Sequence, residues 1–158
     1  MSLSSLSSLH KAAMYGNLEI VKERFNFASS FEQMYALFFA SKHNHLEVVK
    51  FLVSQGIKPN AHGSLLVAAA SGNLEIFKFL VNSGACISDN NYKALFNAVN
   101  NRRDDIVKYI LDREQVTKGK NMSWVLEGFA EKGKFDEVKY LISLGINTED
   151  VDLTKIFR

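Results

Sequence analysis

The chain lacks the features of a secreted or membrane-spanning protein. Its 158 residues include a single cysteine, Cys86, which excludes an internal disulfide framework and is typical of a reducing compartment. No apolar run approaches the roughly 20 residues that a membrane helix needs. The first residues, MSLSSLSSLHKAA, have neither the basic segment nor the long apolar stretch of a secretory signal. We therefore expect a cytoplasmic protein without membrane insertion.

The chain also lacks an excess of charge of one sign. Its net charge is +2, and its most basic-looking segment places Arg102 and Arg103 directly before Asp104 and Asp105. This balance gives no electrostatic surface for nucleic acid. With 47% hydrophobic and 23% charged residues, the chain is able to bury a core of its own. We expect one domain over residues 1–158, a monomer, and no nucleic-acid partner.

One stretch, GFAEKGK at residues 128–134, has the G-x-x-x-x-G-K spacing of a phosphate-binding loop. Such a loop needs a strand before it, a helix after it, and a Ser or Thr directly after the lysine to hold Mg²⁺. Here Lys134 is followed by Phe135. When the segment is aligned with AASGNLEIFKFL at residues 69–80, Gly133 corresponds to Gly72. We therefore interpret the stretch as part of an internal repeat and expect no nucleotide cofactor.

Five copies of a short motif support this interpretation. Each copy keeps an acid and a lysine three residues apart, and the acids follow one another at intervals of 28, 28, 30 and 31 residues. A leucine stands seven residues before the first position of every copy. Two markers with one spacing indicate a structural repeat. The copies are GNLEIVK (16–22), NHLEVVK (44–50), GNLEIFK (72–78), RRDDIVK (102–108) and GKFDEVK (133–139).

The apolar residues of each unit follow helical spacing twice, as in Leu65, Ala68 and Ala69 and then Leu74, Phe77 and Leu80. Each unit is therefore predicted to be a helix pair, and the acid–lysine pairs to lie on a solvated outer face. The fold class is all-α. The predicted helices lie near 7–15 and 18–27, 36–43 and 46–54, 64–71 and 74–82, 94–101 and 104–112, and 123–132 and 135–143.

Two segments resemble the ankyrin repeat, whose signature is T-P-L-H-x-A-A-x-x-G-x-x-x-I-V-x-x-L-L-x-x-G-A-D. They are LHKAAMYGNLEIVKERF (9–25) and LLVAAASGNLEIFKFLVNSGAC (65–86), and the resemblance covers about residues 7–147. The Thr-Pro step is missing throughout, Cys86 stands where the family has Asp, and the period is shorter than the usual 33 or so. The resemblance implies an ankyrin-like helical-repeat solenoid of about five helix pairs, with shortened or absent β-hairpins.

The repeats are expected at about residues 7–33, 34–61, 62–91, 92–121 and 122–147. Residues 148–158 either form a C-terminal cap or begin a sixth repeat. Stacking of the units supplies the core, because one helix pair cannot bury its own apolar face.

The residue types that carry chemistry are few. His43 and His45 are two residues apart, which could suit a metal, but no further ligand stands near them, so we interpret both as exposed turn histidines. His10 occupies the position of the family's Leu-His histidine, which implies a structural hydrogen bond. Cys86 has no histidine at an equivalent position and is interpreted as an exposed thiol, not a nucleophile. We expect no catalytic residue, metal or cofactor, and hence no enzyme.

The resemblance implies a protein–protein interaction module that binds a protein partner through its concave face. In ankyrin proteins the contacts commonly lie just before the first helix of a repeat and at the two positions before its terminal glycine. Trp124 has a second interpretation, in which it covers the core of the fifth unit, and both stay open. The candidates carried over are Tyr15, Lys42, His43, Ser71, Asn100, Asn101, Glu131 and Lys132 at the helix ends, and Met34, His62, Tyr92, Met122 and Trp124 on the loop side.

Three narrower interpretations stay open beside this one. The protein could act as a stoichiometric inhibitor of an enzyme of the kinase type, since ankyrin-built inhibitors of similar size exist. It could instead be the targeting arm of a larger enzyme. A composition rich in Asn, Lys, Ile and Phe, together with divergent short repeats, is also typical of intracellular bacteria and large viruses. By that analogy the chain would be a host-directed effector in the host-cell cytoplasm.

Overall fold

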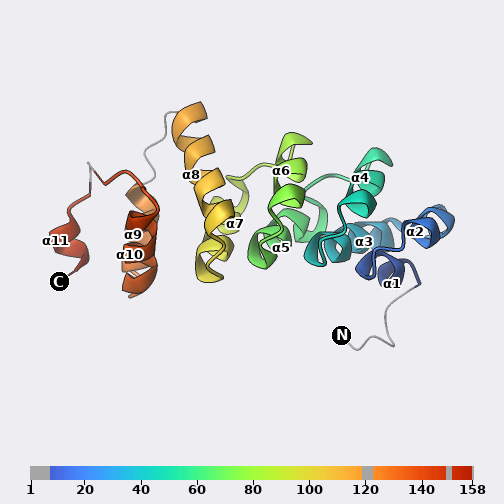
Figure 1. Ribbon diagram of the computed structural model, residues 1–158, viewed down its shortest axis with the longest axis horizontal. Coiled ribbons are helices and arrows are strands. Elements are labelled where there is room, and N and C mark those ends of the chain that lie inside the picture. Colours follow the sequence, from blue (N-terminus) through green and yellow to red (C-terminus); the bar gives the residue numbers. More distant parts are fainter. Residues whose placement is uncertain (1–7, 119–122, 149–150, 158) are drawn as a thin grey trace.

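The protein consists of helix pairs stacked side by side in a computed structural model, which describes residues 8–118, 123–148 and 151–157 (Figure 1). All secondary structure in these ranges is helical, which confirms the predicted fold class. The first helices of the pairs are α1 (Ser8–Met14), α3 (Ser30–Lys42), α5 (Ser64–Ser71), α7 (Asp89–Asn100) and α9 (Ser123–Ala130). The second helices are α2 (Leu18–Phe25), α4 (Leu46–Ser54), α6 (Leu74–Asn82), α8 (Asp104–Lys118) and α10 (Phe135–Ser143). A 3₁₀ turn, η2 (Ala61–Gly63), precedes α5, and the short helix α11 (Leu153–Ile156) follows α10.

Two first helices begin earlier than the sequence analysis predicted. Helix α3 begins at Ser30, ahead of residue 36, because Ser29 and Glu32 form a capping box. The Ser29 hydroxyl accepts from the Glu32 backbone N–H, and the Glu32 carboxylate accepts from the Ser29 N–H at 3.0 Å. Helix α7 begins at Asp89, ahead of residue 94, with an acid in its first turn. Both helices thus begin before residues 34 and 92, where the second and fourth repeats were expected to start.

The core lies between the row of first helices and the row of second helices. Most alanines of the first helices, such as Ala13, Ala40 and Ala69, are fully buried, which lets neighbouring first helices approach closely. Leucine, valine, isoleucine and phenylalanine of the second helices fill the remaining space, as Phe77 and Leu80 do on α6. The outer face of the second helices carries the predicted ion pairs in the first three units. These pairs are Glu19–Lys22 (3.3 Å), Glu47–Lys50 (2.8 Å) and Glu75–Lys78 (3.2 Å).

A polar side chain directly before a second helix reaches back to the preceding helix pair at three joints of the stack. Each of these side chains contacts a backbone carbonyl in the last turn of a first helix, where carbonyls have no partner within the helix. A carbonyl only accepts, so the His45 ring carries its hydrogen on Nε2. We call these contacts the inter-pair hydrogen bonds. They join His45 Nε2 to the Met14 carbonyl (2.8 Å), Asn73 Nδ2 to the Ser41 carbonyl (2.7 Å), and Arg103 Nε to the Ala70 carbonyl (2.9 Å).

The first and fifth pairs use the same position differently. Asn17 follows α1, before which the structure describes no helix, and its side chain accepts from the Ile20 N–H at 3.2 Å and caps its own helix α2. Lys134, in the fifth pair, donates to the side-chain oxygen of Asn100 at 2.7 Å. The residue directly before the second helix thus caps its own helix in the first pair, and in the fifth pair it contacts a side chain of the preceding pair.

Glycine is required at two of the three joints, where the inter-pair side chain is His45 or Arg103, whereas Asn44 with φ +65° occupies the turn at the Asn73 joint. Gly16 has φ +73°, and a Cβ atom there would lie 2.3 Å from Nδ1 of His45. Gly72 has φ +83°, and its Cβ would lie 2.9 Å from Cδ of Arg103. These two glycines thus provide both a left-handed backbone and the space for the neighbouring pair's side chain.

Candidate functional site

The predicted contact residues at the helix ends lie along one side of the stack. We define the first-helix surface as the exposed side of α1, α3, α5, α7 and α9, together with the residues directly before and after each of them. Tyr15 follows α1 and is 67% exposed. All the other predicted helix-end residues are exposed except Ser71, which is half-buried. They are Lys42, His43, Ser71, Asn100, Asn101, Glu131 and Lys132.

The charged form of His43, directly after α3, is disfavoured by the residues around it. The pKa of His43 lies below its ordinary value, because partial burial disfavours the imidazolium and Lys42 and His45 add to the effect. His43 is therefore largely neutral near pH 7. His45 is oriented differently, since its Nε2 contacts the Met14 carbonyl. In the described part of the chain no three or more His, Cys, Asp and Glu residues gather as a metal site.

The loop-side candidates separate into different environments. His62 is exposed in η2, where its φ is +52°. Met34 lies within α3, since that helix begins at Ser30, and Met122 lies outside the described residues. Tyr92 lies within α7 and is buried, so we correct its assignment and leave it out of the contact surface. Trp124, on α9, is 36% exposed.

Tyr92 is a structural residue at the joint of α7, α8 and α9. Its hydroxyl donates to the carboxylate of Glu114 on α8 at 2.7 Å, and both residues are buried. Burial, together with this hydrogen bond, raises the pKa of Tyr92 well above its ordinary value. The Trp124 ring packs on Tyr92 with 5.1 Å between ring centroids. Trp124 therefore covers a buried polar joint with one face and exposes the remainder of its ring.

An aromatic cluster on α3 and η2, in which Phe31 and His62 are exposed and Tyr35 is half-buried, was missed by the sequence analysis. The ring centroids of Tyr35 and His62 are 3.7 Å apart, and Phe31 lies 4.5 Å from Tyr35 and 5.6 Å from His62. Phe31 is 55% exposed. Two signals could have found the cluster: the Ser29–Glu32 capping box, and the four-residue spacing that puts Phe31 and Tyr35 on one helical face. We call Phe31, Tyr35 and His62 the aromatic cluster.

His10 packs against Tyr35 of the aromatic cluster. It is buried on α1, and its ring lies 5.6 Å from the ring of Tyr35 and 5.7 Å from that of Phe39, between centroids. Burial lowers the pKa of His10 against a smaller opposing effect of Glu32, so the ring is largely uncharged at neutral pH.

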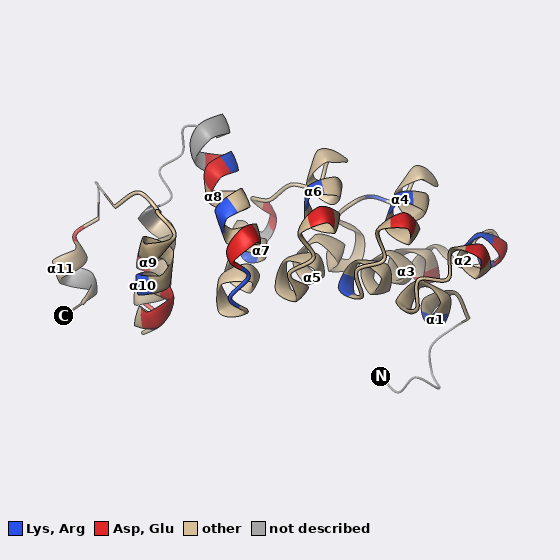
Figure 2. Cartoon of the chain, viewed as in Figure 1, with Lys and Arg blue, Asp and Glu red and all other residues tan. Residues whose placement is uncertain are grey.

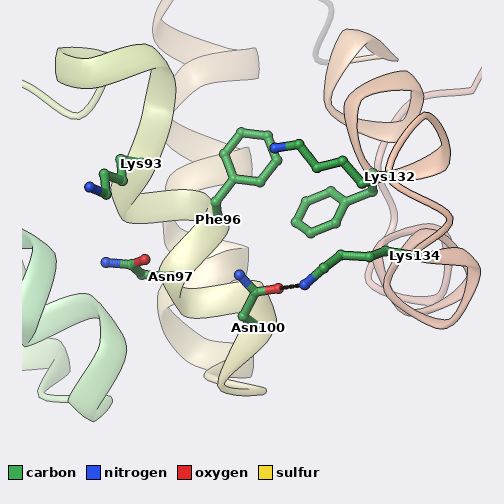
Figure 3. Close-up of a pocket in the computed structure, with 7 residues that line it drawn as sticks. Lys93, Phe96, Asn97, Asn100, Lys132 and Lys134 are labelled. Atoms are coloured by element: carbon green, nitrogen blue, oxygen red, sulfur yellow. Dashed lines mark hydrogen bonds between the residues drawn. The ribbon is translucent and has the colours of Figure 1, made fainter.

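A pocket of about 360 Å³ lies between α7 and α9 on the same surface. Its floor contains Phe96 and Phe129, whose ring centroids are 4.6 Å apart. Lysine and asparagine side chains surround this floor (Figure 3). The polar lining residues are Lys93, Asn97, Asn100, Lys132 and Lys134.

The GFAEKGK stretch forms the end of α9 and the turn before α10, as the repeat alignment predicted. Gly133 has φ +68° in that turn, and the helix α9, not a strand, comes before it. The Lys134 ammonium contacts Asn100 of the neighbouring pair. No helix in the described part is long and apolar enough to cross a membrane.

Helix pairs that recur along the chain and stack side by side define a helical-repeat protein. A family model described as ankyrin repeats (3 copies) matches residues 4–63 and 62–122, which is more than half of the chain. The protein therefore belongs to the ankyrin-repeat family. Ankyrin repeats are generally protein–protein interaction modules, and the family is typically non-enzymatic. No curated protein matches the chain.

Proposed function

We propose that the protein is a non-enzymatic interaction module that binds a protein partner through the first-helix surface, which corresponds to the concave face implied by the resemblance to ankyrin repeats. The observation that carries this proposal is the aromatic cluster. Aromatic side chains are enriched in protein interfaces, since they bury a large area with few rotatable bonds. Phe31, the most exposed ring of α3, has 55% of its surface accessible to solvent.

The second-helix surface, which is the exposed side of α2, α4, α6, α8 and α10, is a weaker candidate for the interface. It carries acid–lysine pairs three residues apart, which satisfy one another and leave little charge for a partner (Figure 2). Binding there would have to break these pairs and dehydrate long flexible side chains. The contrast between the two surfaces favours the first-helix surface as the interface.

The proposal is tested by affinity capture from a lysate of the cells that express the protein, read by mass spectrometry. The double variant Phe31→Ser and His62→Ser removes two exposed rings of the aromatic cluster. Phe135→Ser is the control, since Phe135 is also exposed but begins a second helix. We expect the captured protein to be lost only with the double variant, while circular dichroism shows both folds intact. Equal loss with the control, or no loss with either variant, would contradict the proposal.

The captured partner also distinguishes the narrower functions. A kinase held in a one-to-one complex that loses activity would make the protein a stoichiometric inhibitor. A longer gene product that carries a catalytic domain would make it a targeting arm. A partner from a host cell would make it an effector in the host cytoplasm. We further propose that residues 1–158 act as one domain of five repeats with a C-terminal cap.

A further inference from the structure

The pocket between α7 and α9 is lined by three positively charged lysines, and no acidic side chain among its described lining residues balances them. Lys93 lines it from α7, while Lys132 and Lys134 line it from the turn after α9. Among the described residues that line the pocket, none is acidic. Lys134 lies 4.0 Å from Glu137 outside the pocket, so its charge is partly balanced there. The pocket nevertheless has a positive potential, while the whole chain has a net charge of only +2.

The floor of the pocket is aromatic and belongs to two different repeats. Phe96 comes from α7 and Phe129 from α9, and the planes of their rings are tilted by 35°. The Lys132 ammonium lies 5.0 Å from the centre of the Phe96 ring, so this lysine holds a position over the floor. Figure 3 shows Lys132 and Lys134 reaching from one side toward Phe96 and Asn100. Phe96 is half-buried and Phe129 is almost fully buried, so an apolar side chain would rest on this floor mainly through the Phe96 ring, with anionic groups beside the lysines.

The hydrogen bond of the Asn100 side-chain amide determines which group this amide presents to a ligand. Asn100 accepts from Lys134 through its oxygen at 2.7 Å, which leaves its N–H₂ group as the donor on that side of the pocket. This amide and the three lysines are donors, whereas Asn97 directs its N–H₂ group to the Leu66 carbonyl at 3.4 Å. Four of the five polar side chains that line the pocket therefore favour a ligand that accepts. Carboxylates meet that requirement.

We propose that this pocket binds an acidic peptide segment of the protein partner, with carboxylates at Lys93, Lys132 and Lys134 and one apolar side chain on Phe96 and Phe129. The inference rests on the proposed function, since the pocket is part of the first-helix surface. A peptide is favoured over a nucleic acid because only three of the 19 Lys and Arg residues line this pocket, and the other 16 are balanced by 17 Asp and Glu residues.

The test titrates the ¹⁵N-labelled protein with a defined probe, the capped peptide Glu-Glu-Phe-Glu-Glu, and follows amide chemical shifts. We expect saturable shifts at residues of the pocket, weaker binding as salt increases, and no binding of the matched peptide Gln-Gln-Phe-Gln-Gln. The double variant Lys93→Gln and Lys132→Gln should raise Kd at least about tenfold, because it removes two charges that face the ligand. The control Lys108→Gln and Lys139→Gln removes two exposed charges from α8 and α10 and should leave Kd unchanged.

Three results would overturn the inference: equal binding of the glutamine peptide, equal loss with both double variants, or tighter binding of a ten-residue thymidine oligonucleotide, which would make the ligand a nucleic acid. Failure here is distinguishable from failure of the proposed function. If capture depends on Phe31 and His62 while the peptide does not bind, the pocket inference alone fails. If the peptide binds while capture is unaffected by those two residues, the proposed aromatic interface alone fails.

Discussion

Asn73 donates from its side-chain amide to the backbone carbonyl of Ser41 at 2.7 Å and to that of Lys42 at 3.1 Å, across the joint between the second and third helix pairs. Both carbonyls lie in the last turn of α3, where the helix dipole is negative. Although Asn73 stands at the N-cap position of α6, its side chain makes no hydrogen bond to its own helix. The residue therefore stabilises the stack and not the helix that it precedes.

This geometry predicts an unusual response to Asp. Asn73→Asp should lower the free energy of unfolding by about 1–3 kcal/mol, because the carboxylate cannot donate and faces two carbonyl oxygens. N-cap preferences alone would predict almost no change, since Asp and Asn are equally good caps. The measurement is urea unfolding followed by circular dichroism.

Asn17→Asp is the matched control for that substitution. Asn17 accepts from the Ile20 N–H and caps its own helix, so Asp should fit and keep stability within about 0.5 kcal/mol of the original. The same loss at both positions would show that the inter-pair hydrogen bond does not stabilise the stack.

The assignment of inner and outer faces predicts a large difference between two neighbours on α6. Leu80 is fully buried, so Leu80→Ala should cost about 2–5 kcal/mol through lost packing and the cavity left behind. Lys78→Ala should change stability by less than about 0.5 kcal/mol, because its partner Glu75 is exposed. Chemical denaturation of the two variants decides the point, and equal losses would mean that the faces are misassigned.

The buried Tyr92–Glu114 hydrogen bond predicts a loss of stability in alkali. Tyr92 has a pKa raised above its ordinary value of 10.0 by burial and by the Glu114 carboxylate, so the folded protein keeps its hydroxyl proton longer than the unfolded chain. Its contribution is therefore complete below about pH 10 and declines as the pH rises further. Tyr92→Phe should cost about 1–3 kcal/mol at pH 7, because buried Glu114 loses a donor. The variant should also show a shallower alkaline decline when urea unfolding is measured from pH 8 to 11. An unchanged slope would show that Tyr92 does not titrate on unfolding.

Two glycines should respond to alanine in opposite directions. A Cβ at Gly128, within α9, would meet Phe96 at an ordinary 3.7 Å, so Gly128→Ala should stabilise the protein by about 0.5–1 kcal/mol. Gly16→Ala should destabilise it by more than about 1 kcal/mol, since φ is positive and His45 occupies the space. Thermal unfolding measures both. Destabilisation by Gly128→Ala would instead mean that this glycine is needed for its backbone.

The helix pairs could be predicted from the sequence because each is encoded locally. Apolar spacing fixed the buried face, and the glycines at positions 16 and 72 marked the ends of first helices. The early start of α3 was missed because a 28-residue alignment favours the shared core of a repeat over its variable beginning. The Ser29–Glu32 capping box, which extends that helix, has no counterpart in the repeat motif.

The inter-pair hydrogen bonds could not be predicted in this way. They join residues 31 to 33 positions apart through His45, Asn73 and Arg103, which share only a donor group at the same position. The assignment of Tyr92 was wrong because alignment to a loop position does not report burial, and the hydroxyl of Tyr92 is satisfied by Glu114 from a different helix. The α7–α9 pocket likewise depends on side chains of two repeats meeting in space.

Site-specific photo-crosslinking tests directly whether the first-helix surface binds a protein. Phe31 and Phe135 are both exposed, at 55% and 41%, but begin a first and a second helix respectively. Each is replaced in turn by 4-benzoylphenylalanine, and the protein is irradiated in a lysate of the cells that express it. We expect a discrete protein adduct from position 31 and none from position 135. Adducts of equal yield from both positions, or from position 135 alone, would contradict the proposed interface.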